Sequence, residues 1–502
     1  MRSIICCACF LVLFSTISAW GQQNVLVVPD SNSKIQDALD AAVTLSGDVL
    51  IEVKPGIYHE TLQLGKISTG QRVTLRASAG QSVTTIDASS LYTHAFKGSG
   101  VKNFTLEGFT VRNRFDPLRT CDDAPDPYDC PSSPRGINLT NSTGITIQNC
   151  YFDTTWQAMF FTINDPDLTS EITVIHNTAI GGQGTDPSNP SYTNGQAVNM
   201  TYQKNYDWTM DPPPLPTGNH KLIVADNVFR TNGSAVRYIM QQTYCPDENT
   251  CHTEAYSNGS LVMTGNDIVT YDGYGHNIWG GHGHLIAGNR FHDSTIGAVL
   301  LGASGSVIEN NLYVKNGHGL IVSSMPIVDE STFGDLLVRN NTFAYNLGAG
   351  IVYDAGDVEP PSQIPVVYNN IVAFNEASGI VAVGYPGDTF SFIPIDFQLE
   401  RNDVYGNTLK GLKRDNYLFT LKDISNPKDA TNNYAGAINT SLDLSVDPQF
   451  VNAKARDFSL LKTSPVVNKA TTSRPVPSRD FAGTLRDATP DIGAFEYFNI
   501  PK

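Results

Sequence analysis

Short apolar strands recur along the chain, and each is followed by an asparagine. The phrases "HLIAGNRFH", "SVIENNLYV" and "LLVRNNTFAY" place apolar residues before Asn289, Asn311 and Asn341. The same phrase returns elsewhere, at Asn149, Asn177, Asn227, Asn266, Asn370 and Asn402. A strand repeat of roughly twenty to forty residues without amphipathic helices is typical of stacked solenoid coils. The pattern therefore predicts an all-β chain that folds as a parallel β-helix.

Asparagine suits this repeated turn for two reasons. Its backbone tolerates the left-handed conformation, and its side-chain amide both donates and accepts hydrogen bonds. Coils of a β-helix stack about 4.8 Å apart, so asparagines at equivalent corners can bond to one another as a ladder. One asparagine alone would be an ordinary turn residue. Its recurrence after the same apolar strand favours the ladder, and we predict that these side chains form one continuous line.

A second strand, which begins with a small residue, follows each asparagine after a few positions. Examples are "AVNMT" from Ala197, "AVRYI" from Ala235 and "GLIVS" from Gly319. Strand alternation fixes which side chains face outward. We expect the side chain two positions after the small residue to face outward. The expected outward row is Phe160, Asn199, Arg237, Leu300, Ile321, Val352 and Val381. This row is polar in the middle coils and apolar in the later coils, so a functional surface is predicted on the middle coils.

The remaining segments predict a cap and three large loops. Residues 33–44 form a short helical pattern with Ile35, Leu39 and Ala42 on one face and Ser33 as the N-cap, which would cover the first coil. Long loops leave the repeat at 114–135, 203–219 and 241–259. Insertions in a solenoid tend to collect on its binding face, although loops that only shield the coil edges are an open alternative.

After Asn402 the repeat fades, and the chain ends in a series of short motifs. These are Asp447-Pro448-Gln449-Phe450, Asp457-Phe458-Ser459-Leu460, Ser464-Pro465 and Asp491-Ile492-Gly493-Ala494-Phe495-Glu496. They resemble the closing segment of secreted right-handed β-helix repeat proteins. The early strand and turn "DVLIEVKPGIYHE" resembles the N-terminal end of the families that include pectate lyases and pectin methylesterases.

The resemblance implies a single-stranded right-handed parallel β-helix of the pectate-lyase-like superfamily, with an N-terminal capping helix. The β-helix is expected over residues 22–440, and a closing segment over 441–502 is expected to pack on the last coils. The resemblance implies a fold and not a reaction, because one fold hosts many functions. Gly281-His282-Gly283 and Gly317-His318-Gly319 match only the Gly-His-Gly part of the polygalacturonase signature. No active site is therefore transferred from these families.

The start of the chain predicts export from the cytoplasm. Arg2, an apolar run too short to span a bilayer and the small residues before Gln22 are typical of a secretory signal over residues 1–21. We expect a secreted, extracellular protein, or a periplasmic one in a bacterium. No later run is apolar enough to cross a membrane, and we expect a monomer. A net charge of -16 argues against nucleic acid as a partner, because phosphates would be repelled.

The cysteines outside the predicted signal fall into two close pairs and one single residue. Cys121 with Cys130 and Cys245 with Cys251 each close a polar loop, and in an oxidising compartment both pairs are predicted disulfides. Neither pair has the two-residue spacing of zinc ligands. Cys150 is predicted to be a buried small hydrophobe.

Four histidines in the stretch 270–293 are the most suggestive chemical feature. They are His276, His282, His284 and His292. Histidine titrates near neutral pH, so it can transfer protons or bind a metal. A zinc site needs three or four converging ligands, and no acidic partner motif accompanies these histidines. No metal or other cofactor is predicted from a motif, and calcium is left open.

The alignment of the coils places Trp279 outward, close to Arg237. A flat aromatic face with placed polar groups suits a sugar, so we predict a polysaccharide partner on the coils from about 157 to 284. The predicted substrate-binding residues are Asn199, Lys204, Trp279 and Asp272, and the predicted catalytic residues are Arg237, His276 and His282. Arg237 or Lys204 would neutralise a uronate carboxylate while a histidine took the neighbouring proton, as in a lyase or an epimerase.

Three alternatives stay open. A glycoside hydrolase would need two converging carboxylates among residues such as Asp207, Glu254 and Asp272. The solenoid could also serve as a non-catalytic surface protein that binds a glycan. As plain structure, Trp279 would be an exposed aromatic residue and His276 a satisfied turn histidine.

Overall fold

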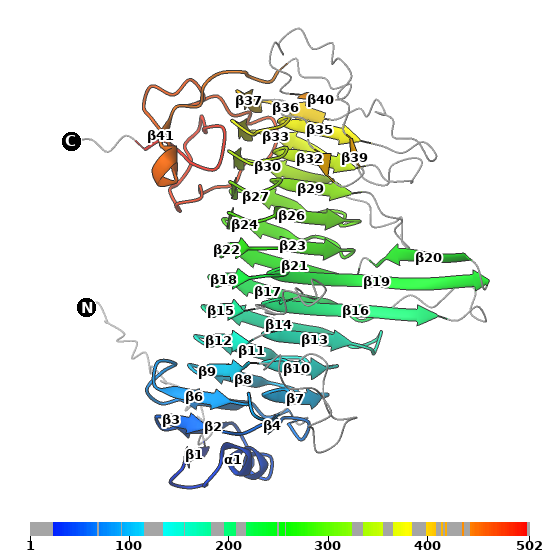
Figure 1. The fold of residues 1–502 in the computed structure, drawn as a ribbon, viewed down its shortest axis with the longest axis vertical. Coiled ribbons are helices and arrows are strands. Elements are labelled where there is room, and N and C mark those ends of the chain that lie inside the picture. The colour runs from blue at the N-terminus through cyan, green and yellow to red at the C-terminus, as the bar shows by residue number, and fades with distance from the viewer. Residues whose placement is uncertain are drawn as a thin grey trace, which may run out of the picture.

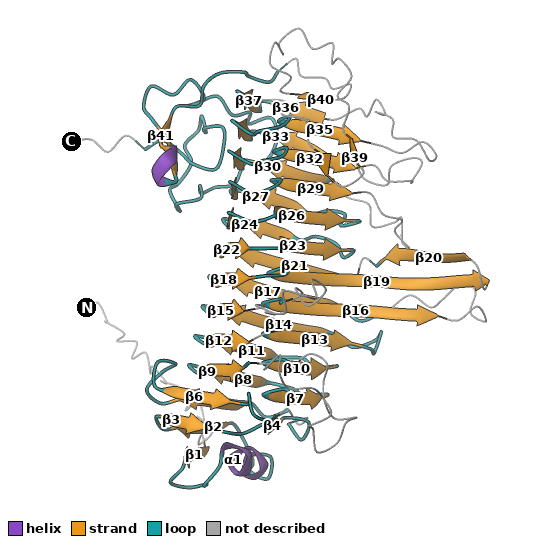
Figure 2. Ribbon diagram, viewed as in Figure 1, coloured by secondary structure: helices purple, strands orange, loops and turns teal. Residues whose placement is uncertain are grey.

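The computed structural model shows one elongated solenoid, in which the strands stack in a continuous column (Figure 1). The structure describes residues 24–67, 70–91, 93–114, 134–154, 156–181, 195–206, 217–247, 250–256, 258–323, 335–354, 365–383, 398–407, 413–414, 417–418, 434–435 and 442–498. Strands make up nearly all of the column, and the helix α1 (Ile35–Ala42) lies at its N-terminal end (Figure 2). The predicted all-β solenoid is confirmed.

Each complete coil contributes one strand to each of three parallel sheets, here called A, B and C. Sheet A contains β1 (Asn24–Val28), β2 (Val49–Val53), β5 (Val73–Ala77), β8 (Phe104–Glu107), β11 (Ile145–Gln148), β14 (Ser170–Ile175), β17 (His220–Ala225), β21 (Gly259–Thr264), β24 (Leu285–Ala287), β27 (Val307–Glu309), β30 (Leu336–Arg339), β33 (Pro365–Tyr368) and β36 (Gln398–Glu400). Sheet B contains β3 (Gly56–Tyr58), β6 (Thr84–Asp87), β9 (Thr110–Asn113), β12 (Tyr151–Thr154), β15 (Thr178–Gly181), β18 (Val228–Thr231), β22 (Asp267–Thr270), β25 (Arg290–His292), β28 (Leu312–Val314), β31 (Thr342–Ala344), β34 (Ile371–Ala373) and β37 (Asp403–Tyr405).

Sheet C contains β4 (Leu62–Gln63), β7 (Phe96–Ser99), β10 (Ile137–Thr140), β13 (Met159–Ile163), β16 (Val198–Tyr206), β19 (Val236–Asp247), β23 (Tyr274–Trp279), β26 (Ile296–Leu301), β29 (Leu320–Ser323), β32 (Ile351–Asp354), β35 (Ile380–Val383) and β40 (Tyr434–Ala435). The short elements outside these stacks are β20 (Thr250–Ala255), β38 (Lys413–Arg414), β39 (Tyr417–Leu418), β41 (Phe450–Asn452), β42 (Asp457–Leu460) and the 3-10 helix η4 (Ala453–Ala455). No helix in the described ranges is long and apolar enough to span a membrane.

The interior of the coils holds the core, because every second strand residue points inward. Equivalent residues of successive coils then stack on one another. The rings of Phe291, Tyr313 and Phe343 are nearly parallel, with centroids 4.8 and 4.7 Å apart. Offset aromatic stacks of this kind add about 0.5–1.5 kcal/mol per pair to the burial of their area.

The predicted asparagine ladder is present at the corner between sheets A and B. The Oδ1 atom of each ladder asparagine accepts from the backbone amide and Nδ2 of the asparagine one coil earlier, as between Asn311 and Asn341 at 2.9 and 3.0 Å. The ladder runs through Asn177, Asn227, Asn266, Asn289, Asn311, Asn341, Asn370 and Asn402. It ends on the carboxylate of Asp443, which accepts from the Asn402 amide at 2.9 Å.

The assignment of Asn149 to this ladder is wrong by one position. Cys150 occupies the ladder corner of that coil, where its backbone amide donates to Asn177 Oδ1 at 2.9 Å. Asn149 is the preceding residue, which has a φ of 55°. The two properties that favour asparagine are therefore divided between neighbouring positions: the first takes the left-handed backbone, and the second supplies the amide. Cys150 itself is fully buried, as predicted.

A second, shorter ladder lies five residues after the first and was not predicted. Its members are Asn316, Asn346, Asn375 and Asn407, all fully buried. Their side chains repeat the same pattern, with Nδ2 to Oδ1 distances of 2.8 Å from Asn346 to Asn375 and from Asn375 to Asn407. The later coils are thus pinned at two corners, which explains why asparagine is so frequent there.

The N-terminal helix α1 (Ile35–Ala42) covers the first coil, as predicted, but its cap is different. Ile35, Ala38, Leu39 and Ala42 are the buried residues of the helix. Ser33 is not the N-cap, because its hydroxyl bonds the Asp37 carboxylate instead. The Glu60 carboxylate accepts from the amides of Ile35 and Gln36, at 3.1 Å each. A carboxylate at a helix N-terminus accepts hydrogen bonds from the unpaired amides and interacts favourably with the helix dipole.

Residues 442–498 pack against the corner between sheets A and B of the last coils. The left-handed asparagines of this corner make the contacts: Asn310 donates to the Arg479 carbonyl at 2.6 Å, and Asn369 donates to the Thr471 carbonyl at 3.0 Å. The buried Arg486 guanidinium donates to Glu496 Oε2 and to Asn310 Oδ1, at 3.0 Å each. This closing segment is thereby tied to three successive coils, since Asn340 also reaches the Asp491 carbonyl.

Asp403 gives the closing segment an expected dependence on pH. Its side chain is fully buried; Oδ1 accepts from the Val446 amide at 3.0 Å, and Oδ2 has no described partner. Burial raises the pKa of Asp403 to about 7, with a further rise from Asp447 and Asp443. The folded chain therefore holds a proton that the unfolded chain, with an ordinary pKa near 4, releases. Stability should fall as the pH rises from about 4 to about 7.

Replacing Asp403 with asparagine should remove this fall in stability. The amide stays neutral at every pH, so the variant should exceed the wild type by about 1–3 kcal/mol at pH 8 and by much less at pH 4.5. Urea denaturation at the two pH values measures the difference. The exposed Asp272→Asn serves as the matched control. An equal effect of Asp403→Asn at both pH values would contradict the assignment.

Candidate functional site

The middle strands of sheet C extend beyond the solenoid. β16 and β19 run far past the neighbouring strands, and β20 returns antiparallel along β19 (Figure 1). The register pairs Tyr244 with His252, so the backbone at Cys245 and Cys251 continues the same hairpin. Their side chains lie outside the described residues, as do Cys121 and Cys130, and both disulfides stay predictions. The extended strands form one side of the surface considered next.

Strand pairing confirms the predicted outward row of sheet C with one correction. Phe160, Asn199, Arg237 and Asn277 occupy successive coils in register. The next member is Val299 and not Leu300, which points into the core. The small residue two positions before Val299 is Gly297, where a Cβ atom would lie 2.3 Å from the Gly319 carbonyl oxygen. That close approach explains why only a small residue starts each of these strands.

An uninterrupted polar network crosses the first half of this surface. Arg135 Nε donates to Gln157 Oε1 at 2.6 Å, and Gln157 Nε2 donates to Gln196 Oε1 at 3.1 Å. The Asn199 amide donates to the same Gln196 oxygen at 2.5 Å, and Thr201 donates to Asn199. We call the outward residues of β10, β13, β16, β19 and β23, with Arg135, Gln157 and Gln196 before them, the sheet C wall.

Two arginines of the sheet C wall have no ionic partner among the side chains that the structure describes. Arg135 lies over the Phe160 ring, with the guanidinium carbon 3.7 Å from the centroid, and it donates to Asn138 Oδ1. Arg237 is partly buried between Asn199 and Asn277. Within the described side chains, no carboxylate acts on the charge of either guanidinium. Burial lowers the pKa of Arg135 to about 10 and also lowers the pKa of Arg237.

Trp279 completes the sheet C wall on the coil after Arg237. It pairs in register with Ile239, and its indole nitrogen donates to Asn277 Oδ1 at 2.5 Å. The indole is partly exposed. The arrangement of an aromatic face, two amides and an unpaired guanidinium can hold a ligand that combines apolar and anionic groups.

The predicted catalytic role of His276 is wrong, because its side chain lies inside the solenoid. It pairs in register with the core residue Val236 and is fully buried, with Nδ1 3.2 Å from the Val299 carbonyl oxygen. Burial lowers the pKa of His276 to about 3. A neutral histidine without access to the surface cannot take a proton from a polymer.

The four histidines of residues 270–293 do not converge. His284 is buried and bonds the Gly280 carbonyl and the Leu261 amide, whereas His292 lies on sheet B beside Asp267 and Asp293. His282 stands at the corner after β23, where Nδ1 is 2.9 Å from Ser304 Oγ. In the described part of the chain, no three histidine, cysteine, aspartate or glutamate side chains gather as metal ligands.

The other predicted site residues lie in different parts of the structure. Asn199 belongs to the sheet C wall but is fully buried within its network. Asp272 is exposed at the turn before β23. Lys204 lies on β16 and Glu254 on β20, but their side chains, like the whole of Asp207, lie outside the description. Arg135, Gln157 and Gln196 were missed, although each lies just before the small residue that starts a sheet C strand.

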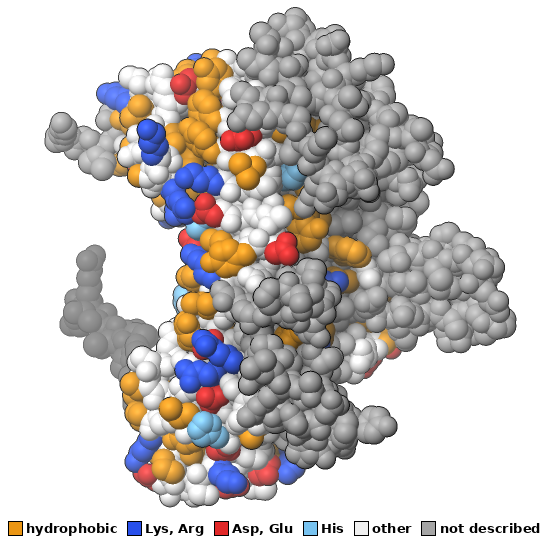
Figure 3. Space-filling model, in the orientation of Figure 1, with side chains coloured by type: hydrophobic (Ala, Val, Ile, Leu, Met, Phe, Trp, Pro, Cys, Tyr) orange, Lys and Arg blue, Asp and Glu red, His pale blue; other side chains and the backbone are white. Residues whose placement is uncertain are grey.

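The described part of the visible surface carries mixed charge. Basic and acidic side chains lie interspersed along it, without a large patch of one sign (Figure 3). The overall charge of -16 is therefore not gathered into an acidic patch on this described surface. Salt largely screens surface charges that lie more than about 10 Å apart. A guanidinium without a nearby carboxylate can therefore attract an anion despite the negative net charge.

The family model described as "Right handed beta helix region" matches residues 247–409. Among solved structures, the chain is similar to the catalytic unit of the thermostable GH87 alpha-1,3-glucanase of Streptomyces thermodiastaticus strain HF3-3, with 14% identity over 84% of this chain and 68% of that one, and a TM-score of 0.45. It is also similar to the A-module of the mannuronan C-5 epimerase AlgE6 of Azotobacter vinelandii, with 13% identity, 83% and 95% coverage and a TM-score of 0.36.

A third similar structure is PfbA, a surface adhesin of Streptococcus pneumoniae, with 14% identity over 70% of this chain and 84% of that one, and a TM-score of 0.39. No curated protein matches the chain in sequence. These likenesses are too distant to carry a function. With its three stacked parallel sheets and the family match, the chain is a right-handed parallel β-helix protein.

Proposed function

We propose that the sheet C wall binds an acidic polysaccharide containing uronate sugars, outside the cytoplasm. The observation that supports this most directly is the partly buried Arg237 guanidinium, which has no carboxylate partner among the described side chains. A cation removed from water without a counter-charge destabilises its surroundings. A bound carboxylate would supply the missing charge and accept two parallel hydrogen bonds from the planar fork.

The neighbours of Arg237 suit the rest of a sugar. The Asn277 and Trp279 side chains lie one coil further on, and an amide beside an indole offers both a hydrogen bond and a flat apolar contact. Arg135, four coils before Trp279, would meet a second carboxylate of the same chain. Coils about 4.8 Å apart place these two arginines roughly 14 Å from each other along the axis, since three coil steps separate them.

The proposed reaction is the removal of the proton next to the uronate carboxylate. Arg237 would stabilise the negative charge that develops on the carboxylate. His282 is the proposed base, because its Nε2 has no described partner while Nδ1 contacts Ser304. Loss of the glycosidic oxygen after proton removal gives a lyase, and return of a proton to the opposite side of the carbon gives an epimerase.

Replacing Arg237 with alanine should weaken binding of an oligouronate at least tenfold, which corresponds to about 1.4 kcal/mol. The carboxylate would lose a charge-assisted bidentate contact in a partly desolvated place. Arg237→Lys should recover only part of the affinity, because an ammonium cannot form the parallel pair of bonds. Calorimetric titration with hexamers of galacturonate, mannuronate and guluronate measures the effect.

The matched control is Arg114→Ala, which removes an exposed arginine that follows β9 of sheet B. It should leave oligouronate binding unchanged. Equal affinities of wild type and Arg237→Ala for every acidic glycan that binds would overturn the proposed site.

A substrate screen separates the rival functions. Ultraviolet absorbance of unsaturated chain ends indicates a lyase, a changed uronate composition in the polymer indicates an epimerase, and new reducing ends without absorbance indicate a hydrolase. Retained binding without any product would leave the non-catalytic surface protein. His282→Gln should abolish turnover while keeping affinity if His282 is the base, whereas a lost affinity would show that it acts in binding.

A further inference from the structure

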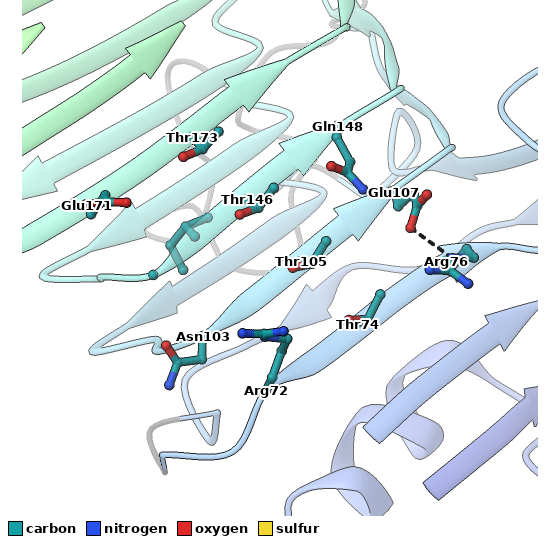
Figure 4. Close-up of a pocket in the computed structure, with 12 residues that line it drawn as sticks. Arg72, Thr74, Arg76, Asn103, Thr105, Glu107, Thr146, Gln148, Glu171 and Thr173 are labelled. Carbon is teal, nitrogen blue, oxygen red and sulfur yellow. Dashed lines mark hydrogen bonds and ion pairs between the residues drawn. The ribbon is translucent and has the colours of Figure 1, made fainter. Parts of the chain in front are cut away.

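A polar groove lies on the outer face of sheet A, on the N-terminal coils. It has a volume of about 400 Å³ and spans β5, β8, β11 and β14. Its floor is a column of four threonines in register: Thr74, Thr105, Thr146 and Thr173 (Figure 4). We call these residues the threonine column. None belongs to the sheet C wall, and the groove does not depend on the function proposed there.

The threonine column interrupts an otherwise apolar row. Strand pairing continues the same outward row into Val25 and Leu50 on one side and into Ile223, Val262 and Leu285 on the other. Threonine and valine are both β-branched and have a similar strand preference, and the neighbouring coils of this row carry apolar residues, so strand formation alone does not select the hydroxyl. Four consecutive hydroxyls therefore indicate a ligand that forms hydrogen bonds.

The threonine hydroxyls are available to a ligand. All four residues are partly exposed, and none of the four hydroxyls bonds another described residue. Threonine is stiff at χ1, so hydroxyls about 4.8 Å apart form a regular array some 14 Å long. Each hydroxyl can both donate and accept, and each methyl group adds a small apolar contact.

Longer side chains form the two walls of the groove. Arg76 and Glu107 are joined at 2.8 Å along one side, and Arg72 and Glu171 stand along the other (Figure 4). The second wall has a gap at Gly144, where a Cβ atom would lie 2.6 Å from Asn103 Oδ1. Two arginines and two glutamates leave the groove without net charge, so an anionic chain gains little there.

From this geometry we infer that the groove on sheet A is a second glycan site, which takes a short segment of a neutral, hydroxyl-rich polysaccharide lying along the solenoid axis. The linear array matches a linear polymer, and the charge balance distinguishes its ligand from the uronate chain proposed for sheet C. No aromatic side chain lines the groove, so contact with the glycan consists chiefly of hydrogen bonds to the threonine hydroxyls and of small methyl contacts.

The test is a titration of the full chain with hexamers of xylose, of glucose in β-1,4 and β-1,3 linkage, and of galacturonate, followed by saturation-transfer NMR. Thr105→Val with Thr146→Val removes two hydroxyls and keeps shape and strand preference. It should weaken binding of a neutral hexamer at least tenfold, with an unchanged thermal midpoint. Thr105→Arg with Thr146→Arg, which fills the groove, should abolish that binding.

Thr264→Val is the matched control, because Thr264 lies on sheet A beyond the groove, and it should change nothing. Arg237→Ala should also leave neutral-hexamer binding intact, which separates this inference from the sheet C proposal. Failure of every neutral hexamer to bind, binding of the galacturonate hexamer alone, or equal affinity in the valine variants would overturn the inference.

Discussion

Replacing Asn311 with alanine should lower the free energy of unfolding by about 3–5 kcal/mol. The Asn311 side chain donates to the Ile286 carbonyl at 2.8 Å and to Asn341 Oδ1 at 3.0 Å, and its Oδ1 accepts from the Asn289 amide at 2.9 Å. Alanine would leave these groups without partners inside the fold, and each unsatisfied buried group costs about 1–3 kcal/mol. Urea denaturation followed by circular dichroism measures the loss.

The control for Asn311 is Asn219→Ala, whose side chain is exposed and which should change stability by less than about 0.5 kcal/mol. Asn311→Asp gives a second comparison, since the carboxylate keeps an acceptor but lacks the two donors. It should be destabilising as well. A loss of less than 1 kcal/mol in Asn311→Ala would show that the ladder bonds contribute little beyond those of the strands.

Replacing Arg486 with methionine should destabilise the closing segment by about 3–5 kcal/mol. Arg486 and Glu496 are almost completely buried, with side-chain exposures of 2% and 3%. Methionine has a similar length but would leave the Glu496 carboxylate charged and buried without its partner. Three further acceptors, Asn310 Oδ1 and the carbonyls of Asp491 and Gly493, would lose a donor. Limited proteolysis should then cleave within 442–498 before it cleaves the coils.

A paired substitution distinguishes charge from packing at this place. Arg486→Met with Glu496→Leu removes both charges and should recover part of the stability, because apolar replacements of a buried pair are often tolerated. The exposed pair of Lys66 and Asp40 is the control, and Lys66→Ala should cost less than about 1 kcal/mol. No recovery in the double variant would mean that the hydrogen bonds to Asn310 and the carbonyls dominate.

The solenoid could be predicted because one local phrase is repeated and each copy must bury the same strand. The double-asparagine copies, such as Asn310 with Asn311, show why boundaries are harder. Two adjacent positions of one corner favour asparagine for different reasons, the first for its backbone and the second for its side-chain amide. After Asn149 the second position of the corner holds Cys150, and the pattern then points to the wrong residue.

The candidate site was less predictable because it depends on register and on distant neighbours. Trp279 and Asn277 face outward as expected, since Gly275 sets the same phase as Ala235. His276 lies one residue out of this phase, which places it in the core, and Leu300 was misplaced because Ala298 resembles the start of a strand. Arg135 is ionically unpaired among the described residues, a fact that depends on absent carboxylates and cannot be seen in a local motif.

The asparagine ladder has a direction. Every ladder oxygen accepts from the asparagine of the preceding coil, and every ladder Nδ2 donates to the asparagine oxygen of the following coil, so the amide dipoles add along the axis and end with their positive pole at the last coil. The negative charge of Asp443 lies at that pole. A whole coil could therefore be deleted or duplicated in the middle with its polarity intact, whereas a chain cut before Asp443 would end in donors that face no acceptor.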